Sequence, residues 1–395
     1  MAASTARSAG FEPAHRLKEL PPYLFVEIDK AKKRLQAAGK DVIDLGVGDP
    51  DLPTPPHILE RLKATADDPA NHRYSFTEGI PELRQAIARW YQRRFGVQLD
   101  WQTEILPLLG SKEGIAHLPL AVANPGDAVL VPDPCYPPYR SGTILAGAEI
   151  VSMPLLEENQ FFPDFGAISQ KAARRAKVMF LNYPNNPTAA VATAKQLQEA
   201  IDFAKSFGCA IAHDAAYSDV AFDGYQPISF LQLPEAKSVG IEFHSLSKTY
   251  NMTGWRIGWA CGNATLIASL NKLKSNLDSG IFQPVQWAGI AALDGDQEPM
   301  RKTVAIYQQR RDVFVNGLTQ AGWKIEKPVA SLYIWTRVPT TESSIVFAAR
   351  VLEQAHVVLT PGVGFGPSGE GYIRMSLTVP TDRIQEAVGR LSKAL

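Results

Sequence analysis

The chain has 395 residues, of which 45% are hydrophobic, and its 40 basic residues balance its 40 acidic residues. Such a chain can bury a large core. Because its net charge is zero and it contains no long run of charges of one sign, its electrostatics exclude a fit to nucleic acid or to an anionic membrane. Its three cysteines are far apart and form no CxxC pair, which argues against a disulfide framework and a metal site and fits a reducing compartment. No apolar run approaches the roughly 20 residues of a spanning helix, so we expect a cytoplasmic protein without a membrane partner.

Short apolar segments rich in β-branched residues alternate with helix-length amphipathic segments along most of the chain. This alternation predicts an α/β fold, with a mostly parallel sheet covered by helices on both faces. The expected strands are 104–109, 127–132, 177–184, 209–214, 238–245 and 256–262. Open sheets of this kind bind ligands just beyond the carboxyl ends of their strands, so we expect the functional residues there.

The last part of the chain has a different pattern. The long amphipathic segment "TVAIYQQRRDVFVNGLTQAGW" is followed by a strand, a second helix, another strand and a closing helix. This order predicts a smaller α/β domain, which the N-terminal segment before about Pro56 is expected to complete. We therefore predict an N-terminal arm with part of the small domain (1–55), a large domain (56–290) and a small C-terminal domain (291–395).

Three polar residues follow predicted strands, and each has an ordinary structural explanation when it is taken alone. Asp214 ends the strand "CAIAHD", three positions before Tyr217, and such an acid often caps the next helix. Asn186 lies in "NYPNNPT", whose Asn and Pro residues also suit a plain turn. Ser111 in "LGSKEG" opens a helix, where it is either an N-cap or part of a phosphate site formed by backbone N–H groups.

The stretch "HSLSKTYNMTGWRIGWACG" (244–262) places Lys248 close to Ser245, Ser247 and Arg256. A solvated lysine needs no such neighbours, whereas hydroxyls and a planar guanidinium suit a phosphate. The strand-end residues together suit a pyridine ring that carries an aldehyde and a phosphate arm, because they offer a lysine for a Schiff base, an acid, hydrogen-bond donors and an aromatic ring. The acid, Asp214, would keep the ring nitrogen protonated and so make the ring an electron sink.

With these residues in place, the sequence resembles the fold type I pyridoxal-phosphate enzymes, the class I and II aminotransferases. The resemblance covers nearly the whole chain, from "VIDLGVGDPDLPTP" and "YSFTEGIPELRQAIARW" through "NYPNNPT" and "HDAAY" to "SLSKTYNMTGWRIG" and "GYIRMSL". It implies a large domain with a mostly parallel seven-stranded sheet, a smaller α/β domain and pyridoxal 5'-phosphate as cofactor. It also implies amino-acid and 2-oxo-acid substrates and a homodimer with shared active sites.

The resemblance assigns roles around the cofactor ring by matching motifs. It implies Lys248 as the Schiff-base lysine and proton-transfer base, and Asp214 as the partner of the ring nitrogen. Tyr217 and Asn186 would donate to the phenolic oxygen. Tyr136 in "PDPCYPPY" is similar to the aromatic residue that stacks on the ring.

The same resemblance implies ligands for the phosphate and for the substrate. Arg374 in "GYIRMSL" is similar to the arginine that grips the substrate α-carboxylate bidentately, and Gly48 to the small residue against which that carboxylate rests. The family's usual glycine after "NPT" is Ala189 here, a departure that concerns the local backbone. The implied phosphate ligands are Ser111, Lys112, Ser245 and Arg256, with Ser247 as a weaker candidate and Tyr74 reaching over from the neighbouring subunit.

Within this family, stretches such as "DSGIFQPVQ" and "TPGVGFGPSGEGYIRMSLT" look most similar to the enzymes that act on LL-diaminopimelate and 2-oxoglutarate in lysine biosynthesis. A diaminopimelate site must also bind a distal amino-carboxylate, for which Lys112, Glu78, Tyr23 and Ser279 are candidates. Aminotransferases for aspartate, alanine, aromatic amino acids or N-succinyldiaminopimelate share most of these residues and stay open as alternatives. A β-lyase on the same cofactor would keep them too, and a non-catalytic regulator is disfavoured because the first forty or so residues are too few and too weakly basic for a DNA-binding module.

Overall fold

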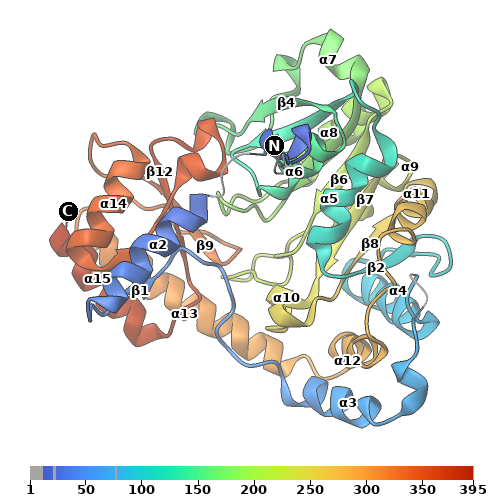
Figure 1. Ribbon diagram of the computed structural model, residues 1–395, viewed down its shortest axis with the longest axis horizontal. Helices are drawn as coiled ribbons and strands as arrows, with labels where there is room; N and C mark the ends of the chain where they lie inside the picture. Colours follow the sequence, from blue (N-terminus) through green and yellow to red (C-terminus); the bar gives the residue numbers. More distant parts are fainter. Residues whose placement is uncertain (1–11, 21–23, 76–77, 395) are drawn as a thin grey trace, which may run out of the picture.

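A seven-stranded sheet forms the centre of the larger part of the molecule, with the order β2-β8-β7-β6-β5-β3-β4. The computed structural model describes residues 12–20, 24–75 and 78–394 (Figure 1). β8 runs antiparallel to both of its neighbours and the other strands run parallel to one another, which confirms the predicted mostly parallel sheet. The strands are β2 (Ile105–Leu108), β3 (Ala128–Asp133), β4 (Glu149–Pro154), β5 (Ala176–Asn182), β6 (Ala210–Asp214), β7 (Gly240–Ser245) and β8 (Gly258–Gly262).

The six predicted segments all contain strands, but the structure differs from the prediction at three places. The edge strand β4 was not among them, because most of its side chains are exposed or half-buried and it lacks a continuous apolar run. β7 begins only at Gly240, since the preceding residues form the short helix α9 (Ala236–Val239). β8 begins at Gly258, after Arg256, whose φ of 55° is left-handed.

Helices cover both faces of this sheet, and successive strand residues alternate between the two layers. Val129 and Val131 of β3 pack into the layer with α5, whereas Leu130 packs into the layer with α4. α3 (Pro56–Ala66) packs outside α12. One face carries α5 (Ser111–Val122), α6 (Pro138–Leu145) and α11 (Ala264–Lys274), and the other carries α4 (Pro81–Phe95), α8 (Ala194–Phe207) and α12 (Gln283–Asp294).

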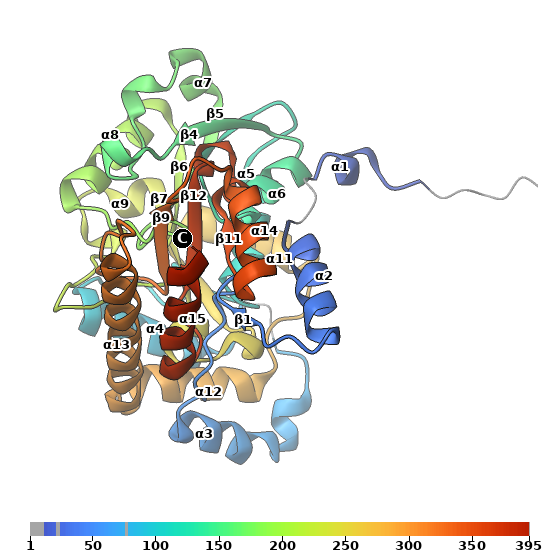
Figure 2. The ribbon, with the colours of Figure 1, turned by 90° about the vertical axis from the view of Figure 1, so that its left-hand side faces the viewer.

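A second part of the molecule has its own apolar core, formed by α13, α14 and α15 together with a three-stranded antiparallel sheet in the order β11-β12-β9 (Figure 2). The N-terminal strand β1 (Ile43–Asp44) pairs in parallel with β10 (Val357–Val358), and α2 (Leu24–Ala37) packs beside them. The domain boundaries at residues 56 and 291 stay a prediction. The other elements are β9 (Tyr333–Arg337), β11 (Thr360–Pro361), β12 (Tyr372–Ser376), α13 (Glu298–Gln320), α14 (Ser344–Ala355) and α15 (Thr381–Ala394).

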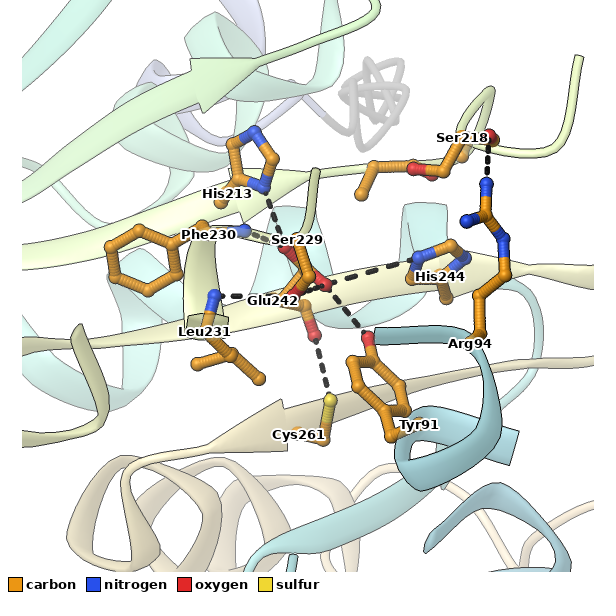
Figure 3. Close-up of polar contacts among 12 residues, drawn as sticks. Tyr91, Arg94, His213, Ser218, Ser229, Phe230, Leu231, Glu242, His244 and Cys261 are labelled. Carbon is orange, nitrogen blue, oxygen red and sulfur yellow. Dashed lines mark hydrogen bonds and ion pairs between the residues drawn. The ribbon is translucent and has the colours of Figure 1, made fainter. Parts of the chain in front are cut away.

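A buried carboxylate ties β6 and β7 to the helical layer that contains α4 (Figure 3). Glu242 of β7 accepts hydrogen bonds from the His213 Nδ1 (2.9 Å), the Tyr91 hydroxyl (2.9 Å), the Ser229 hydroxyl (2.8 Å) and the Phe230 N–H (2.9 Å). Burial alone would raise the pKa of Glu242, but these donors and the charges of nearby histidines hold it below its ordinary value. This carboxylate is therefore a satisfied structural group.

The cysteines are free and buried, and burial raises the pKa of Cys209 to about 12. A thiol that does not ionise is a poor nucleophile and a poor metal ligand. Over residues 12–20, 24–75 and 78–394, the side chains bring no three candidate metal ligands together. No helix in those ranges is both long and apolar enough to cross a membrane.

Candidate active site

A cavity of about 520 Å³ opens at the carboxyl ends of β5, β6 and β7, where residues of both parts of the molecule meet. Its volume lies in the range of small-molecule sites. Asn182, Asp214 and Ser245, which line it, are the last residues of these three strands. The cavity brings together Gly48, Ser111, Lys112, Tyr136, Asn186, Asp214, Tyr217, Ser245, Ser247, Lys248, Arg256 and Arg374, all of which the sequence predicted for the site.

Asp214 presents a buried carboxylate at the end of β6. Its Oδ2 accepts a hydrogen bond from the Tyr139 hydroxyl at 2.9 Å, and its Oδ1 accepts one from the Ala216 N–H at 3.3 Å. Burial raises the pKa of Asp214 to about 6, because these two donors only partly offset the lost hydration. The ordinary explanation as a helix cap is not met, since turn residues follow and no helix begins there.

Lys248 lies in the short helix α10 (Leu246–Thr249), directly after β7. Ser245 caps this helix, because its hydroxyl accepts the Ser247 N–H at 3.2 Å. The Lys248 Nζ is half-buried and donates to the Gly48 carbonyl at 2.7 Å, so the lysine points across the cavity toward the N-terminal segment. A lysine held by one neutral carbonyl can exchange that partner for a ligand group.

A set of backbone and guanidinium donors surrounds the start of α5. Gly110 is the N-cap of this helix with a φ of 79°, and Ser111 is its first helical residue, so the Ser111 side chain is not the cap. The Arg256 guanidinium donates to the Thr253 carbonyl at 2.8 Å and to the Leu109 carbonyl at 3.3 Å. A Cβ on Gly110 would overlap that guanidinium, and the φ of 79° also favours glycine at this position.

Arg374 of β12 points into the cavity from the small sheet. Its guanidinium donates to the Asn186 Oδ1 at 2.9 Å and to the Gly46 carbonyl at 2.6 Å, while its buried Nε has no hydrogen-bond partner among the described residues. Because the Asn186 Oδ1 accepts from Arg374, the donor group of that amide is Nδ2. The arrangement therefore sets a fixed, planar cation beside an amide donor.

Aromatic residues close the cavity on two sides. The Tyr217 hydroxyl lies 3.1 Å from the Tyr333 hydroxyl, and the Tyr333 ring lies below the Arg374 guanidinium. Tyr136, in the loop just before α6, contacts Tyr139 of α6 edge to face, with ring centroids 5.8 Å apart, so this segment supplies both an aromatic wall and the hydroxyl that holds Asp214.

Residues 40–391 match the family described as aminotransferase class I and II. The chain belongs to that family. An LL-diaminopimelate aminotransferase from Moorella thermoacetica is 54% identical over 384 residues, which cover 97% of this chain and 98% of the relative. The substrate-bound structure of BacF from Bacillus subtilis is 41% identical, with a TM-score of 0.93 over 97% of this chain and 98% of that chain. A probable N-succinyldiaminopimelate aminotransferase from Thermus thermophilus is 37% identical, with a TM-score of 0.89 over 94% of this chain and 100% of that chain.

One predicted residue of this aminotransferase does not line the cavity within one subunit. The Tyr74 side chain is 88% exposed and lies outside the cavity. Tyr23, another predicted residue, lies outside the described residues. Among the other candidates for the distal group, Lys112 lines the cavity, whereas Glu78 bonds to Asn271 and Ser279 is exposed on the surface.

The aminotransferase cavity also contains residues that the sequence reasoning missed, notably Asp29, Tyr333 and Phe365. Tyr333 lies in "SLYIWTRV", which the sequence pattern marks only as a strand. Tyr139 of α6 does not line the cavity, but it holds Asp214 from behind through its hydroxyl. No short motif of the sequence marks this contact between α6 and the end of β6.

Ala189 departs from the glycine that is usual in the family, and its backbone explains the family preference. It has a φ of 58°, in the left-handed region that glycine adopts without strain. Its N–H still donates to the Asn185 carbonyl at 3.0 Å, so the turn that presents Asn186 is kept.

Proposed function

We propose that the protein is a pyridoxal-phosphate-dependent aminotransferase that exchanges the amino group of LL-diaminopimelate with 2-oxoglutarate in lysine biosynthesis. The observation that carries the substrate assignment is the 54% identity to a relative of that name over 97% of this chain. Amino-acid and 2-oxo-acid substrates follow from the family. A cytoplasmic location stays a prediction from the composition.

The residues in the cavity fit pyridoxal phosphate on three observations. Asp214 is a buried carboxylate with a raised pKa, and a protonated ring nitrogen would supply the cation that it lacks. The start of α5 and the Arg256 guanidinium lie close together beside Gly110, and they would hold a phosphate. Lys248, with one carbonyl partner, would attach the cofactor.

When bound, this cofactor supplies an aldehyde for the amino group and a ring that stabilises negative charge at the substrate Cα. The Arg374 guanidinium would hold the substrate α-carboxylate through charge-assisted hydrogen bonds. The Lys248 Nζ would then take the proton from the substrate Cα, and in the reverse half-reaction it would return a proton to the Cα of the 2-oxo acid. Asp214 would keep its negative charge next to the ring nitrogen throughout.

The distal end of diaminopimelate carries both a carboxylate and an ammonium group, and the cavity contains one residue suited to each. Lys112 would pair with the distal carboxylate, and Asp29 of α2 with the distal ammonium. Asp29 forms ion pairs with Lys33 at 2.6 Å and with Lys32 at 3.5 Å, so it would exchange one ammonium partner for another. Exposed pairs of this kind contribute only about 0.2–1 kcal/mol, and their exchange costs little.

The absorbance of the cofactor-loaded enzyme, mixed with single amino donors and no 2-oxo acid, tests the assignment. We expect rapid conversion to the amino form of the cofactor with LL-diaminopimelate and with glutamate, and slow conversion with meso-diaminopimelate. Conversion only with aspartate, alanine or phenylalanine would contradict the substrate assignment. Release of pyruvate and ammonia without an acceptor would indicate a lyase.

We propose a homodimer because Tyr74 is exposed in one subunit and resembles a phosphate ligand of the other. Mixing unfolded Lys248→Ala and Tyr74→Ala chains and refolding them together tests this arrangement. If the sites are shared, hybrid dimers contain one intact site, and the mixture should regain roughly one quarter of the wild-type activity. Separate refolding of each variant is the control, and no regain on mixing would mean that each site is built from one chain.

A further inference from the structure

Tyr333 occupies a central position between the residues of the proposed active site. It lies on β9 with only 3% of its side chain surface exposed, and its hydroxyl lies 3.1 Å from that of Tyr217. A Cβ on Gly48 would overlap the Tyr333 hydroxyl, so the N-terminal segment that accepts the Lys248 hydrogen bond lies directly against this side chain.

The ring of Tyr333 is a platform for Arg374. The guanidinium carbon lies 4.2 Å from the centre of the Tyr333 ring and 4.6 Å from that of Phe365, so the cation is held between two aromatic rings. The sheet register explains the contact: Tyr333 of β9 pairs with Ser376 of β12, and Arg374 is two residues further along on the same face. Such diagonal neighbours are within reach of long and aromatic side chains.

We infer that Tyr333 is a positioning residue of the reaction, whose hydroxyl fixes the hydroxyl of Tyr217 and whose ring fixes the guanidinium of Arg374. The inference rests on the proposed function, because Tyr217 and Arg374 act there on the cofactor and on the substrate. The hydroxyl and the ring of Tyr333 therefore make separate contributions, which different substitutions can remove one at a time.

The hydroxyl contribution follows from hydrogen-bond counting. Tyr217 has one hydroxyl proton, and the phenolic oxygen of the cofactor would receive it, so the Tyr217 oxygen can only accept from Tyr333. A hydroxyl that accepts a hydrogen bond is a stronger donor in turn. Tyr333 suits this role, because the cationic groups that face it are Arg374 and Lys248, and the negative group is Asp49. Burial would raise the pKa of Tyr333, but the Arg374 and Lys248 cations favour its ionised form and lower its pKa, which makes its hydroxyl a better donor.

The test compares Tyr333→Phe with Tyr333→Leu in the cofactor-loaded enzyme. Tyr333→Phe keeps the platform, so we expect the KM for the amino acid to change less than about twofold while kcat falls about 3- to 10-fold, as for one lost hydrogen bond. The pH midpoint of the absorbance of the bound cofactor should rise, because its phenolic oxygen then has a weaker donor. Tyr333→Leu should show both changes and also raise the KM about 10-fold.

Two controls separate this role from a general loss of structure. Tyr307→Phe removes another buried hydroxyl, one without a hydrogen-bond partner among the described residues, and should leave the absorbance midpoint and the KM unchanged. In a Tyr217→Phe background, Tyr333→Phe should no longer move the midpoint, since the two hydroxyls act as a unit. If Tyr333→Leu does not fold, Phe365→Leu removes the other face of the platform and should raise the KM alone.

The inference is overturned if Tyr333→Phe leaves the absorbance midpoint unchanged, if it raises the KM as much as Tyr333→Leu does, or if its effect persists in the Tyr217→Phe background. These outcomes differ from a failure of the proposed function. An enzyme that binds the cofactor but accepts no amino donor still gives the absorbance titration. A protein that binds no cofactor can be titrated by ultraviolet difference absorbance, where the wild type should ionise a tyrosine at lower pH than Tyr333→Phe does.

Discussion

Asp214→Asn should stabilise the cofactor-free protein at neutral pH, although the same substitution should abolish efficient catalysis. The folded protein holds the Asp214 carboxyl in a buried position where burial raises its pKa from 3.8 to about 6. The unfolded chain ionises this carboxyl at its ordinary value. Above pH 6 the folded state therefore carries a buried negative charge that the unfolded chain leaves in water.

The size of the effect follows from the difference between the two pKa values. A shift of about two units corresponds to about 3 kcal/mol of unfolding free energy, at about 1.4 kcal/mol for each unit. Well below pH 4 the carboxyl is protonated in both states and contributes nothing. Stability is lost as the pH rises from about 4 to about 6, and the cost is complete above that range. Asparagine carries no charge, and its Oδ1 can still accept from the Tyr139 hydroxyl.

Urea unfolding of both cofactor-free proteins between pH 4 and pH 8, at one fixed protomer concentration, measures the difference. We expect a gain of only about 0.5 kcal/mol for the variant at pH 4 and a gain of about 3 kcal/mol at pH 7.5. Equal stability at pH 7.5, or a difference that does not vary with pH, would refute the reasoning. Addition of pyridoxal phosphate should reverse the order, since a ring cation beside Asp214 stabilises only the wild type.

The remaining predictions concern the walls of the cavity and the strands below it. Gly48→Ala places a Cβ on the Tyr333 hydroxyl and should raise the KM for the amino acid about 10-fold or more, measured by steady-state kinetics. Glu242→Gln replaces an acceptor of four hydrogen bonds and should lower the unfolding free energy by about 3 kcal/mol in urea at neutral pH, the opposite sign to Asp214→Asn. Because the pKa of Glu242 is lowered from 4.5, its contribution is complete above that pH and is lost as the pH falls below it. Ala189→Gly should raise the melting temperature slightly, because about 1 kcal/mol of left-handed strain exceeds the entropy cost of glycine.

The sequence predicted the cavity mainly through the ends of strands. Asp214 and Ser245 end β6 and β7, and parallel strands bring such ends to one edge of the sheet whatever the lengths of the helices between them. The prediction therefore needed only the strand pattern and short motifs. Where a boundary was wrong, as at Arg256 before β8, the residue still reached the cavity, because the loop at the strand end carries the site.

Other residues could not be predicted in this way because their contacts depend on geometry that no short motif contains. Tyr333 reaches Arg374 through the register of β9 against β12, which single-sequence patterns do not define. Tyr74 is exposed in one chain, so the contacts of one chain do not test its predicted role in a neighbouring subunit. The edge strand β4 was missed because it has only one buried residue.

The two buried carboxylates on β6 and β7 differ in the groups that offset their burial. Glu242 pairs across the strands with His213, and the hydrogen bond and charge of that histidine, with the charge of His244 and the Ser229 hydroxyl, hold its pKa below the ordinary value. Asp214, the next residue after His213, points to the opposite face, where the Tyr139 hydroxyl, the Ala216 N–H and the His213 charge leave its pKa raised. Burial is complete at both positions, so the donors and cations around each carboxylate decide the direction of the shift. A carboxylate whose burial is not offset gains from a cationic partner in the adjacent cavity, which supports the proposed place of Asp214 beside the ring nitrogen.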